Sequence, residues 1–243
     1  MTAPGYREVP PHPALRPFVE CCWCALGPAG AGAHDVLPDG CVDFLIDRAA
    51  GAGWLIGAMT KKHAFVPARD VAIAAVRFRP GGARAFVGHD LDAFTDGRAE
   101  LALLGGHLRE LALRALDARS AEATVDALQR ALLSLLPDRP ADAVAHALAG
   151  LVADPASFRV DEAAAAVGIT RQHLAREVRR RTGLSPKELA AILRFRRACA
   201  ALRSPAPLAA VAADNGYADQ AHLARSVRRF AGATPGAVRR GGA

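Results

Sequence analysis

The sequence predicts an α+β protein in two parts, an N-terminal antiparallel β-barrel-like domain with added helices and a C-terminal all-α domain. Three observations predict this division. Short stretches rich in β-branched and aromatic residues, separated by Gly and Pro, fill residues 17–80. Apolar residues at helical spacing take over after residue 101. The excess positive charge lies entirely in the last hundred residues.

Length and composition exclude several classes of protein. The 243 residues are 51% apolar and 23% charged, which is enough for one or two packed domains and argues against disorder. No apolar run approaches the roughly 20 residues of a membrane span, and the first residues contain no apolar stretch typical of a signal peptide. Five cysteines are an odd, modest number for a disulfide scaffold. We therefore expect a cytoplasmic protein with reduced thiols.

Five strands are expected in the N-terminal part, each bounded by turn-forming residues such as Pro38-Asp39-Gly40. They cover residues 18–26, 41–47, 54–57, 63–66 and 71–78. We expect these strands to form an antiparallel sheet that closes on itself.

Two apolar seams at helical spacing follow the strands. The first comprises Leu101, Leu104, Leu108, Leu111 and Ala115, and the second Val125, Leu128, Leu132 and Leu135. Such seams usually pack within their own chain, with a dimer contact as the alternative. The residues Pro137-Asp138-Arg139-Pro140 end the pattern. We therefore predict one domain over residues 1–136, β-rich to residue 100 and helical from 101, and a second over residues 140–243.

The second predicted domain is helical throughout. Its expected helices cover residues 140–152, 160–167, 171–182, 186–202, 208–214, 220–231 and 235–240. Ser185-Pro186-Lys187-Glu188 has the pattern of a capping box with proline at the first helical position, and Thr234-Pro235 repeats its start.

Charge divides between the two predicted domains. Residues 1–140 hold 15 Lys and Arg against 16 Asp and Glu, whereas residues 141–243 hold 16 against 8. A basic module joined to a near-neutral one indicates an anionic partner for the basic part. A GC-rich genome would account for the preference for Arg over Lys, but not for this asymmetry.

An internal repeat is the strongest signal in the chain. Residues 173–186 read HLAREVRRRTGLSP and residues 222–235 read HLARSVRRFAGATP, with nine of fourteen positions identical. An apolar helical stretch and a glycine, Gly168 or Gly216, precede each copy. A helix, a short glycine-containing turn and a second helix make a helix-turn-helix unit.

The second helix of each unit has an apolar and a polar face. Leu174 and Val178 lie four residues apart and face inward, as do Leu223 and Val227. The polar faces carry Arg171, Gln172, Arg176, Arg179 and Arg180 in the first unit, and Gln220, Ala221, Arg225, Arg228 and Arg229 in the second. Early residues of a recognition helix reach bases in the major groove, and later basic residues meet phosphates. A solvated Arg-rich surface is the alternative interpretation of any single such helix.

A long helix over residues 186–202 would join the two units. Its 17 residues span about 25 Å. This length suits two recognition helices roughly one DNA turn apart, near 34 Å. One chain would then read two successive major grooves.

Here the sequence resembles the AraC/XylS family of bacterial transcription regulators over about residues 150–240. The stretch LAAVAADNGYADQAHLARSVRRFAGATPGAVRR follows the family signature in its Ala-Ala helix, Gly-aromatic turn, Leu-x-Arg core, Phe230, Gly232 and Thr-Pro. The resemblance implies a sequence-specific DNA-binding regulator with two helix-turn-helix units joined by a long helix. It also implies duplex operator DNA as the partner.

Carried over, the family's base-reading positions fall on Gln172 and Arg176 in the first unit, and on Gln220, Ala221, His222 and Arg225 in the second. We expect Arg171 to join this group, and Arg179, Arg180, Arg228 and Arg229 to contact phosphates. The sequence departs from the family at Val178 and Val227, where Phe is common, and at Asp219, where Ser is frequent at the helix cap. Ala221 cannot hydrogen-bond to a base.

The N-terminal part resembles a sensor-type domain found in some family members. The matching pieces are Phe18, Trp23, the stretch at residues 38–43 and the stretch at residues 76–81. Such domains are often small, cupin-like barrels that bind an effector. Trp54, Phe65 and Phe78 are the residues we expect to line an effector pocket. Two alternatives stay open: these aromatic side chains only fill a core, or this part only dimerises.

Four cysteines in the predicted strands raise the alternative of a thiol or metal sensor. Cys22 and Cys24 are expected on one strand face and Cys21 on the other, with Cys41 on the next strand and His12 and His34 as extra ligands. This spacing does not match the paired ligands of a structural zinc site. Buried thiols that pack as small apolar groups are the interpretation we favour.

No pattern in the chain indicates an enzyme. Asp39, Asp43 and Asp47 alternate in the strand region, but turn and surface positions explain such carboxylates more often than a metal site. We find no nucleophile elbow, P-loop or zinc-protease motif. The sequence thus predicts no catalytic residue, cofactor or metal. Besides DNA and an unidentified small effector, RNA polymerase and a second copy of the chain are candidate partners, and a membrane is not.

Overall fold

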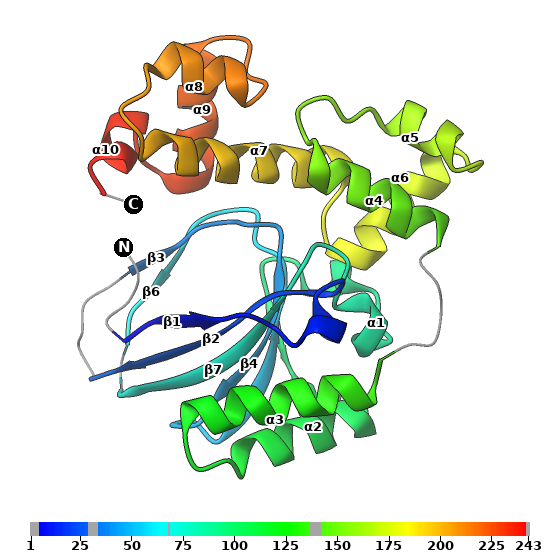
Figure 1. The fold of residues 1–243 in the computed structure, drawn as a ribbon, viewed down its shortest axis with the longest axis vertical. Coiled ribbons are helices and arrows are strands. Elements are labelled where there is room, and N and C mark those ends of the chain that lie inside the picture. The colour runs from blue at the N-terminus through cyan, green and yellow to red at the C-terminus, as the bar shows by residue number, and fades with distance from the viewer. Residues whose placement is uncertain (1–4, 29–33, 68, 137–141, 242–243) are drawn as a thin grey trace.

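A computed structural model describes residues 5–28, 34–67, 69–136 and 142–241 (Figure 1). Its N-terminal part is built on a six-stranded sheet in which every neighbouring pair is antiparallel. From edge to edge the order is β1 (Arg7–Val9), β2 (Val19–Gly27), β7 (Val71–Phe78), β4 (Val42–Asp47), β5 (Ala52–Ile56) and β8 (Arg98–Glu100). Two further strands, β3 (His34–Val36) and β6 (His63–Phe65), pair only with each other. The α+β class with an antiparallel N-terminal sheet is confirmed.

The sheet does not close on itself, which corrects one detail of the prediction. Among the described residues β1 and β8 are its two edges, and neither pairs with the other. Both edge strands and the β3–β6 pair have only three residues per strand. Three residues are too few to show an alternating pattern, and so β1, β3 and β8 escaped sequence analysis. The five predicted segments correspond to β2, β4, β5 and β7 and to the short β6, which was predicted as residues 63–66.

One face of the sheet packs on two helices, α2 (Gly106–Leu116) and α3 (Ala121–Ser134), as Figure 1 shows. The rings of Phe44 and Phe78 meet edge to face on this side, with centroids 4.8 Å apart. The predicted seams supply the other half of this core, since Leu108 and Leu128 are fully buried. Both seams therefore pack within their own chain.

Short helical segments connect the strands and helices of this part. They are η1 (Pro13–Leu15), α1 (Arg84–Val87), η2 (Leu91–Phe94) and η3 (Leu101–Leu103). The segment η2 is important below because it contacts the C-terminal helices.

The C-terminal part consists of seven helices along the described residues 142–241, as expected. They are α4 (Ala143–Ala153), α5 (Val160–Ala166), α6 (Arg171–Thr182), α7 (Pro186–Leu202), α8 (Leu208–Asp214), α9 (Gln220–Ala231) and α10 (Pro235–Arg239). The bounds of α6, α7, α8 and α9 match the predicted ranges. The predicted boundary at residues 137–140 lies outside the described residues. None of the helices in the described segments is long and apolar enough to cross a bilayer.

Caps explain why sequence analysis located these helices well. The predicted capping box at the start of α7 is present, because Ser185 Oγ accepts from the Glu188 backbone and Glu188 accepts from the Ser185 backbone. Thr234 Oγ1 likewise accepts from the backbone of Ala237 at the start of α10. In Figure 1, α7 crosses above the sheet region, with α4–α6 near one end and α8–α10 near the other.

Candidate nucleic-acid interface and effector cavity

The two repeats fold into equivalent helix-turn-helix units, α5–α6 and α8–α9. Gly168 and Gly216 stand in the turns with φ of +70° and +72°, a conformation that favours glycine. The inward-facing leucine and valine of each second helix are fully buried (Leu174, Val178, Leu223 and Val227). The apolar faces predicted from the repeat are therefore the packed faces.

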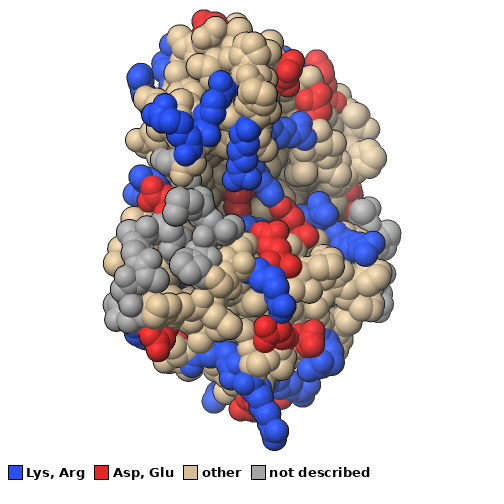
Figure 2. Space-filling view, turned by 60° about the vertical axis from the view of Figure 1, so that its left-hand side comes forward, with Lys and Arg blue, Asp and Glu red and all other residues tan. Residues whose placement is uncertain are grey.

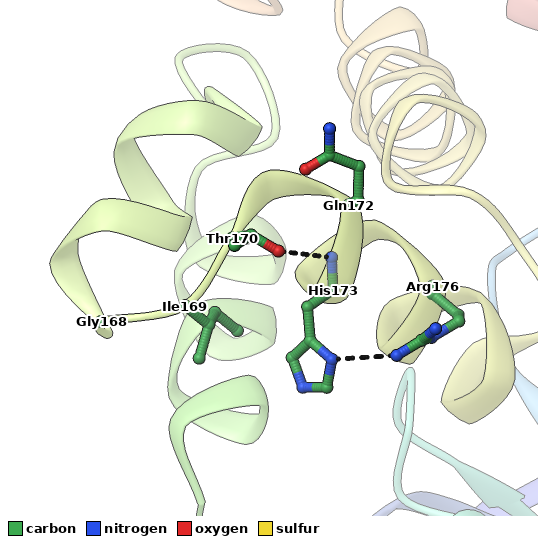
Figure 3. A pocket seen from close by; sticks show the side chains of 6 residues that line it. All are labelled: Gly168, Ile169, Thr170, Gln172, His173 and Arg176. Atoms are coloured by element: carbon green, nitrogen blue, oxygen red, sulfur yellow. Dashed lines mark hydrogen bonds between the residues drawn. The ribbon is translucent and has the colours of Figure 1, made fainter.

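The first turn of α6 presents its polar side chains to solvent. Thr170 Oγ1 caps the helix by accepting from the backbone of His173, at 3.2 Å. Arg171, Gln172 and Arg176 are exposed. Arg176 Nη2 lies 3.2 Å from His173 Nδ1, and together with Gln172 they border a shallow notch at the turn (Figure 3). The notch leaves guanidinium and amide groups accessible to a base edge.

The first turn of α9 is similar, except at His222. Gln220, Ala221 and Arg225 are exposed, and Asp219 caps the helix by accepting from the His222 backbone at 2.6 Å. The His222 ring is half-buried and packs edge to face on Tyr217, with centroids 5.2 Å apart. Its Nδ1 accepts from the backbone of Ala218 at 3.4 Å. In this structure the imidazole therefore stabilises the turn.

The later arginines of α6 and α9 have different surroundings. In α6, Arg180 donates to Asp90 at 2.8 Å, and Arg179 lies 3.7 Å from Asp92. Both carboxylates belong to the N-terminal part. The hydrogen bond from Arg180 lowers the pKa of Asp90 below its usual value. In α9, Arg228 and Arg229 are exposed, and neither has a carboxylate partner among the described residues.

Charge is distributed over the surface as the sequence arithmetic predicts. Figure 2 shows Lys and Arg side chains gathered over the C-terminal helices at the top of the molecule. On the lower, sheet-bearing part the two signs are mixed. The basic surface coincides with the part of the chain that carries both units.

A cavity of about 950 Å³ lies between the second face of the sheet, the β3–β6 pair and helix α7. Its apolar lining comes from aromatic and aliphatic side chains on all three elements (Trp23, Leu45, Trp54, Ile56, Phe65, Ile73 and Phe195). Arg196 of α7 and Arg203, the residue that follows the last residue of α7, also line it. The cavity thus joins the sheet to the helix that connects the two units.

A buried charged group forms part of the cavity wall. Arg77 Nε lies 3.3 Å from Asp43 Oδ1 and 3.4 Å from Asp39 Oδ2. Burial raises the pKa of Asp43 to about 6, although Arg77 acts in the opposite direction. Burial alone would lower the pKa of Arg77, but the two carboxylates hold it above its usual value. Arg196 of α7 pairs with Glu20 of β2, which makes an ionic contact between α7 and the sheet.

The predicted pocket aromatics divide between the two faces of the sheet. Trp54 and Phe65 line the cavity. Phe78 does not line it, because side chains alternate along β7: Ile73 and Arg77 face the cavity, and Phe78 is fully buried on the opposite face. Phe78 packs on Phe44 and Phe86 instead.

The cysteines do not gather into one site. As alternation predicts, Cys21 packs on one face of the sheet and Cys22 and Cys24 on the other. All are free thiols, and no group of three or more His, Cys, Asp or Glu side chains that could hold a metal occurs among the described residues. Burial raises the pKa of both Cys21 and Cys22 to about 12, and that of Cys41 well above its usual value. Thiols in this state are poor nucleophiles and poor metal ligands.

A family model described as a helix-turn-helix domain, of the AraC type, matches residues 163–241, which contain α6–α10 and the end of α5. The C-terminal part of the chain therefore carries a helix-turn-helix domain of the AraC type, the DNA-binding module of AraC/XylS transcription regulators. A second family model, described as a domain of unknown function (DUF6597), matches residues 7–100, from β1 to β8. No curated protein matches the chain.

Solved structures of transcription regulators are similar to parts of this chain or to nearly all of it. The DNA-binding domain of the global transcriptional factor AdpA, solved with a target DNA, is 26% identical over 41% of this chain and 92% of its own, with a TM-score of 0.39. An AraC-type regulator from Chromobacterium violaceum is 22% identical over 42% and 92%, with a TM-score of 0.38. ToxT from Vibrio cholerae is 9% identical over 95% and 94%, with a TM-score of 0.44.

Several residues at the regulator's two candidate sites escaped sequence analysis. Arg77 is a charged residue in an otherwise apolar strand, and that pattern could have indicated a buried polar site. Arg196 and Arg203 gave no such signal, because a charged helix face is usually solvated. Asp90 and Asp92 lie in a short turn whose contact with α6 depends entirely on how distant segments pack.

Proposed function

We propose that α6 and α9 are the recognition helices of one DNA-binding module that reads two successive major grooves. The observation that carries the proposal is the equivalent exposure of Arg176 and Arg225, which lie 49 residues apart at the same position of the repeat. Arg can hold the O6 and N7 of guanine with two hydrogen bonds. Exposed Gln172 and Gln220 supply the matching amide for adenine.

The remaining assigned roles follow from position on the helix. Arg171 and Ala221 lie in the first turns and would contact the groove, while Arg179, Arg180, Arg228 and Arg229 would contact phosphates. His222 would act on the readout through the turn that its ring stabilises. We propose the division into a regulatory part over residues 1–136 and a DNA-binding part over residues 140–243, with the protein in the cytoplasm. RNA polymerase and a second copy of the chain stay predicted partners.

Footprinting of the full chain on genomic DNA, followed by a salt titration on the recovered site, tests the DNA-binding proposal. We expect protection in two adjacent major grooves on one face of the duplex. If six phosphates are neutralised, affinity should fall by about 10³ between 50 and 200 mM salt. A single protected groove, or an affinity indifferent to salt, would refute the proposed arrangement.

For the cavity, we propose a small organic anion with an apolar body as the effector. Every carboxylate that lines the cavity has a partner: Glu8 accepts from Tyr6, Asp35 from Lys62, Asp47 from Arg69 and Asp96 from Thr60, and Asp39 and Asp43 pair with Arg77. Arg98 and Arg203 line it without a carboxylate partner among the described residues.

A further observation supports this choice of ligand class. The guanidinium of Arg98 lies over the Trp54 ring, 4.5 Å from its centroid, beside the apolar lining.

Thermal shift measurements on the full chain test the effector proposal. Pairs of probes share an apolar body and differ in charge: 4-phenylbutyrate against 4-phenylbutylamine, and octanoate against octylamine. We expect only the carboxylates to stabilise the protein, by about 2.7 kcal/mol at a hundredfold excess over the dissociation constant. Arg203→Gln should remove this effect, while Arg130→Gln on α3 should retain it. Equal shifts with the amines would refute an anion site.

A further inference from the structure

The C-terminal turn of α6 is seated on the segment Asp90–Thr95 of the N-terminal part. Arg180 donates to Asp90 at 2.8 Å, and Arg179 lies 3.7 Å from Asp92. The hydroxyl of Thr95 donates to the carbonyl oxygen of Gly183 at 2.6 Å. Three separate side chains of this segment therefore contact the end of one recognition helix.

The contact between the end of α6 and this segment is closely packed as well as ionic. Gly183 ends α6 with φ of +81°, and a Cβ at this position would lie 2.9 Å from Thr95 Oγ1 and 3.2 Å from the Leu91 carbonyl oxygen. Only glycine combines this conformation with this approach. The segment Asp90–Thr95 is thus closely complementary in shape to the end of α6.

The equivalent turn of α9 lies against a cation of the N-terminal part and not against carboxylates: a Cβ at Gly232, the counterpart of Gly183, would lie 3.5 Å from Lys62 Nζ. Arg228 and Arg229 correspond to Arg179 and Arg180 in the repeat, and both are exposed without a carboxylate partner. The guanidinium of Arg229 lies 4.7 Å from the ring centroid of its neighbour Phe230. Among the described residues, the arginines at the end of α6 are therefore paired with carboxylates, and those at the end of α9 are not.

We propose that Asp90, Asp92 and Thr95 form an autoinhibitory contact that competes with DNA phosphates for the end of α6. The inference rests on the proposed phosphate roles of Arg179 and Arg180. A guanidinium that donates to a carboxylate cannot use the same N–H groups on a phosphate, and carboxylates held at the DNA surface repel its backbone. Release of α6 from the segment precedes full engagement of the first unit.

The same stretch of chain continues directly into the effector cavity. Asp96, Gly97 and Arg98 line the cavity, and Asp96 accepts from the backbone and hydroxyl of Thr60. A ligand that draws Arg98 inward therefore acts on a segment whose preceding residues hold α6. This continuity gives the cavity a short physical route to the DNA-binding surface.

A charge-neutral substitution gives the first test, by DNA affinity of the full chain on its footprinted site. Thr95→Val removes the hydroxyl that holds Gly183, and we expect affinity to rise about threefold. Thr95→Ser retains a hydroxyl and should stay at the wild-type value. The double variant Asp90→Asn/Asp92→Asn should raise affinity about three- to tenfold.

The double variant also removes two negative charges, so it needs a control with the same change elsewhere. Asp117→Asn/Asp126→Asn alters two exposed carboxylates on α2 and α3, across the sheet from α7. It should raise affinity by less than twofold. Equal gains for the two double variants, together with no gain for Thr95→Val, would overturn the autoinhibitory contact.

A comparison of the two units separates this inference from the phosphate assignment on which it rests. Arg180→Gln should weaken DNA binding more in the Asp90→Asn/Asp92→Asn background than in the wild type, because the guanidinium is then free for phosphate. Arg229→Gln should weaken it equally in both backgrounds. If both substitutions weaken binding but Arg180→Gln is indifferent to the background, the contact is refuted and the phosphate roles stand. If neither weakens binding, both proposals fail.

Discussion

The two helix-turn-helix units share a repeated sequence, yet they make different contacts with the rest of the molecule. Helix α6 contacts α4, α7 and η2. Because η2 belongs to the N-terminal part, the first unit packs against that part of the chain. Helix α9 packs mainly on α7, α8 and α10 of the C-terminal part, and Gly232 at its end lies near Lys62 of the N-terminal part. Near-identical local sequences therefore give the same local fold but different contacts with the rest of the chain. With the proposed contact, the arginines at the end of one unit are held by carboxylates, while those of the other unit are unpaired among the described residues.

The largest expected effect concerns the buried cores of the units. Leu174→Ala and Leu223→Ala should each reduce the free energy of unfolding by about 2–5 kcal/mol, because both side chains are fully buried. Hydrogen exchange should show faster exchange confined to α8–α10 for Leu223→Ala. For Leu174→Ala it should extend from α4 to α7. If the same helices exchanged faster in both variants, the two units would not differ in how they pack on the rest of the chain.

Base readout should be equivalent in the two units. Arg176→Ala and Arg225→Ala are each expected to cost about 1–3 kcal/mol on the preferred site and to relax specificity at one base position. Selection of binding sites from random DNA would show the two relaxed positions about one helical turn apart. Arg130→Ala, an exposed arginine on α3, serves as the control and should leave the selected site unchanged. A uniform loss over all sequences would contradict the readout roles.

The two turns should differ in their tolerance of a side chain. Gly168→Ala places a residue at positive φ, which costs about 1–2 kcal/mol, but its Cβ would meet nothing within 4 Å. Gly216→Ala has the same conformation and would bring its Cβ to 2.6 Å from Ala156 Cβ. We therefore expect a larger loss of thermal stability for Gly216→Ala. Equal melting temperatures would argue that the Ala156 loop yields without cost.

The smallest expected effects concern the N-terminal caps of α6 and α9. Thr170→Ala and Asp219→Ala each remove a side-chain acceptor from a helix N-terminus and should cost about 1 kcal/mol in thermal denaturation. Asp219→Asn keeps an acceptor while removing a negative charge from the proposed DNA face. We expect it to retain stability and strengthen DNA binding slightly. Weaker binding by this variant would place Asp219 away from the phosphate backbone.

Local signals predicted the C-terminal helices because their ends are encoded nearby. Thr170, Ser185, Asp219 and Thr234 each cap a helix through a backbone group three residues away. The repeat likewise located both recognition helices and their exposed first turns. The role of His222 was less accessible, because its ring contact with Tyr217 depends on how the turn folds back.

Strand alternation gave partial information about the N-terminal part. It separated Cys21 from Cys22 and Cys24 correctly, since successive side chains point to opposite faces of a sheet. The same rule places Phe78 opposite the cavity once the faces are known. From sequence alone, however, nothing said which face would be covered by α2 and α3 and which by α7.

The sequence by itself determined the helices, their caps, the two-unit repeat, the longer strands and the division of charge. Each of these depends on residues a few positions apart or on simple composition. The open sheet, the cavity beneath α7 and the seating of α6 on Asp90 and Asp92 were decided by tertiary structure. The cavity and the seating of α6 bring together side chains far apart in the chain, Arg196 with Glu20 at a separation of 176 residues and Arg180 with Asp90 at 90. No local pattern reports such a pairing, because it depends on the packing of whole elements against one another.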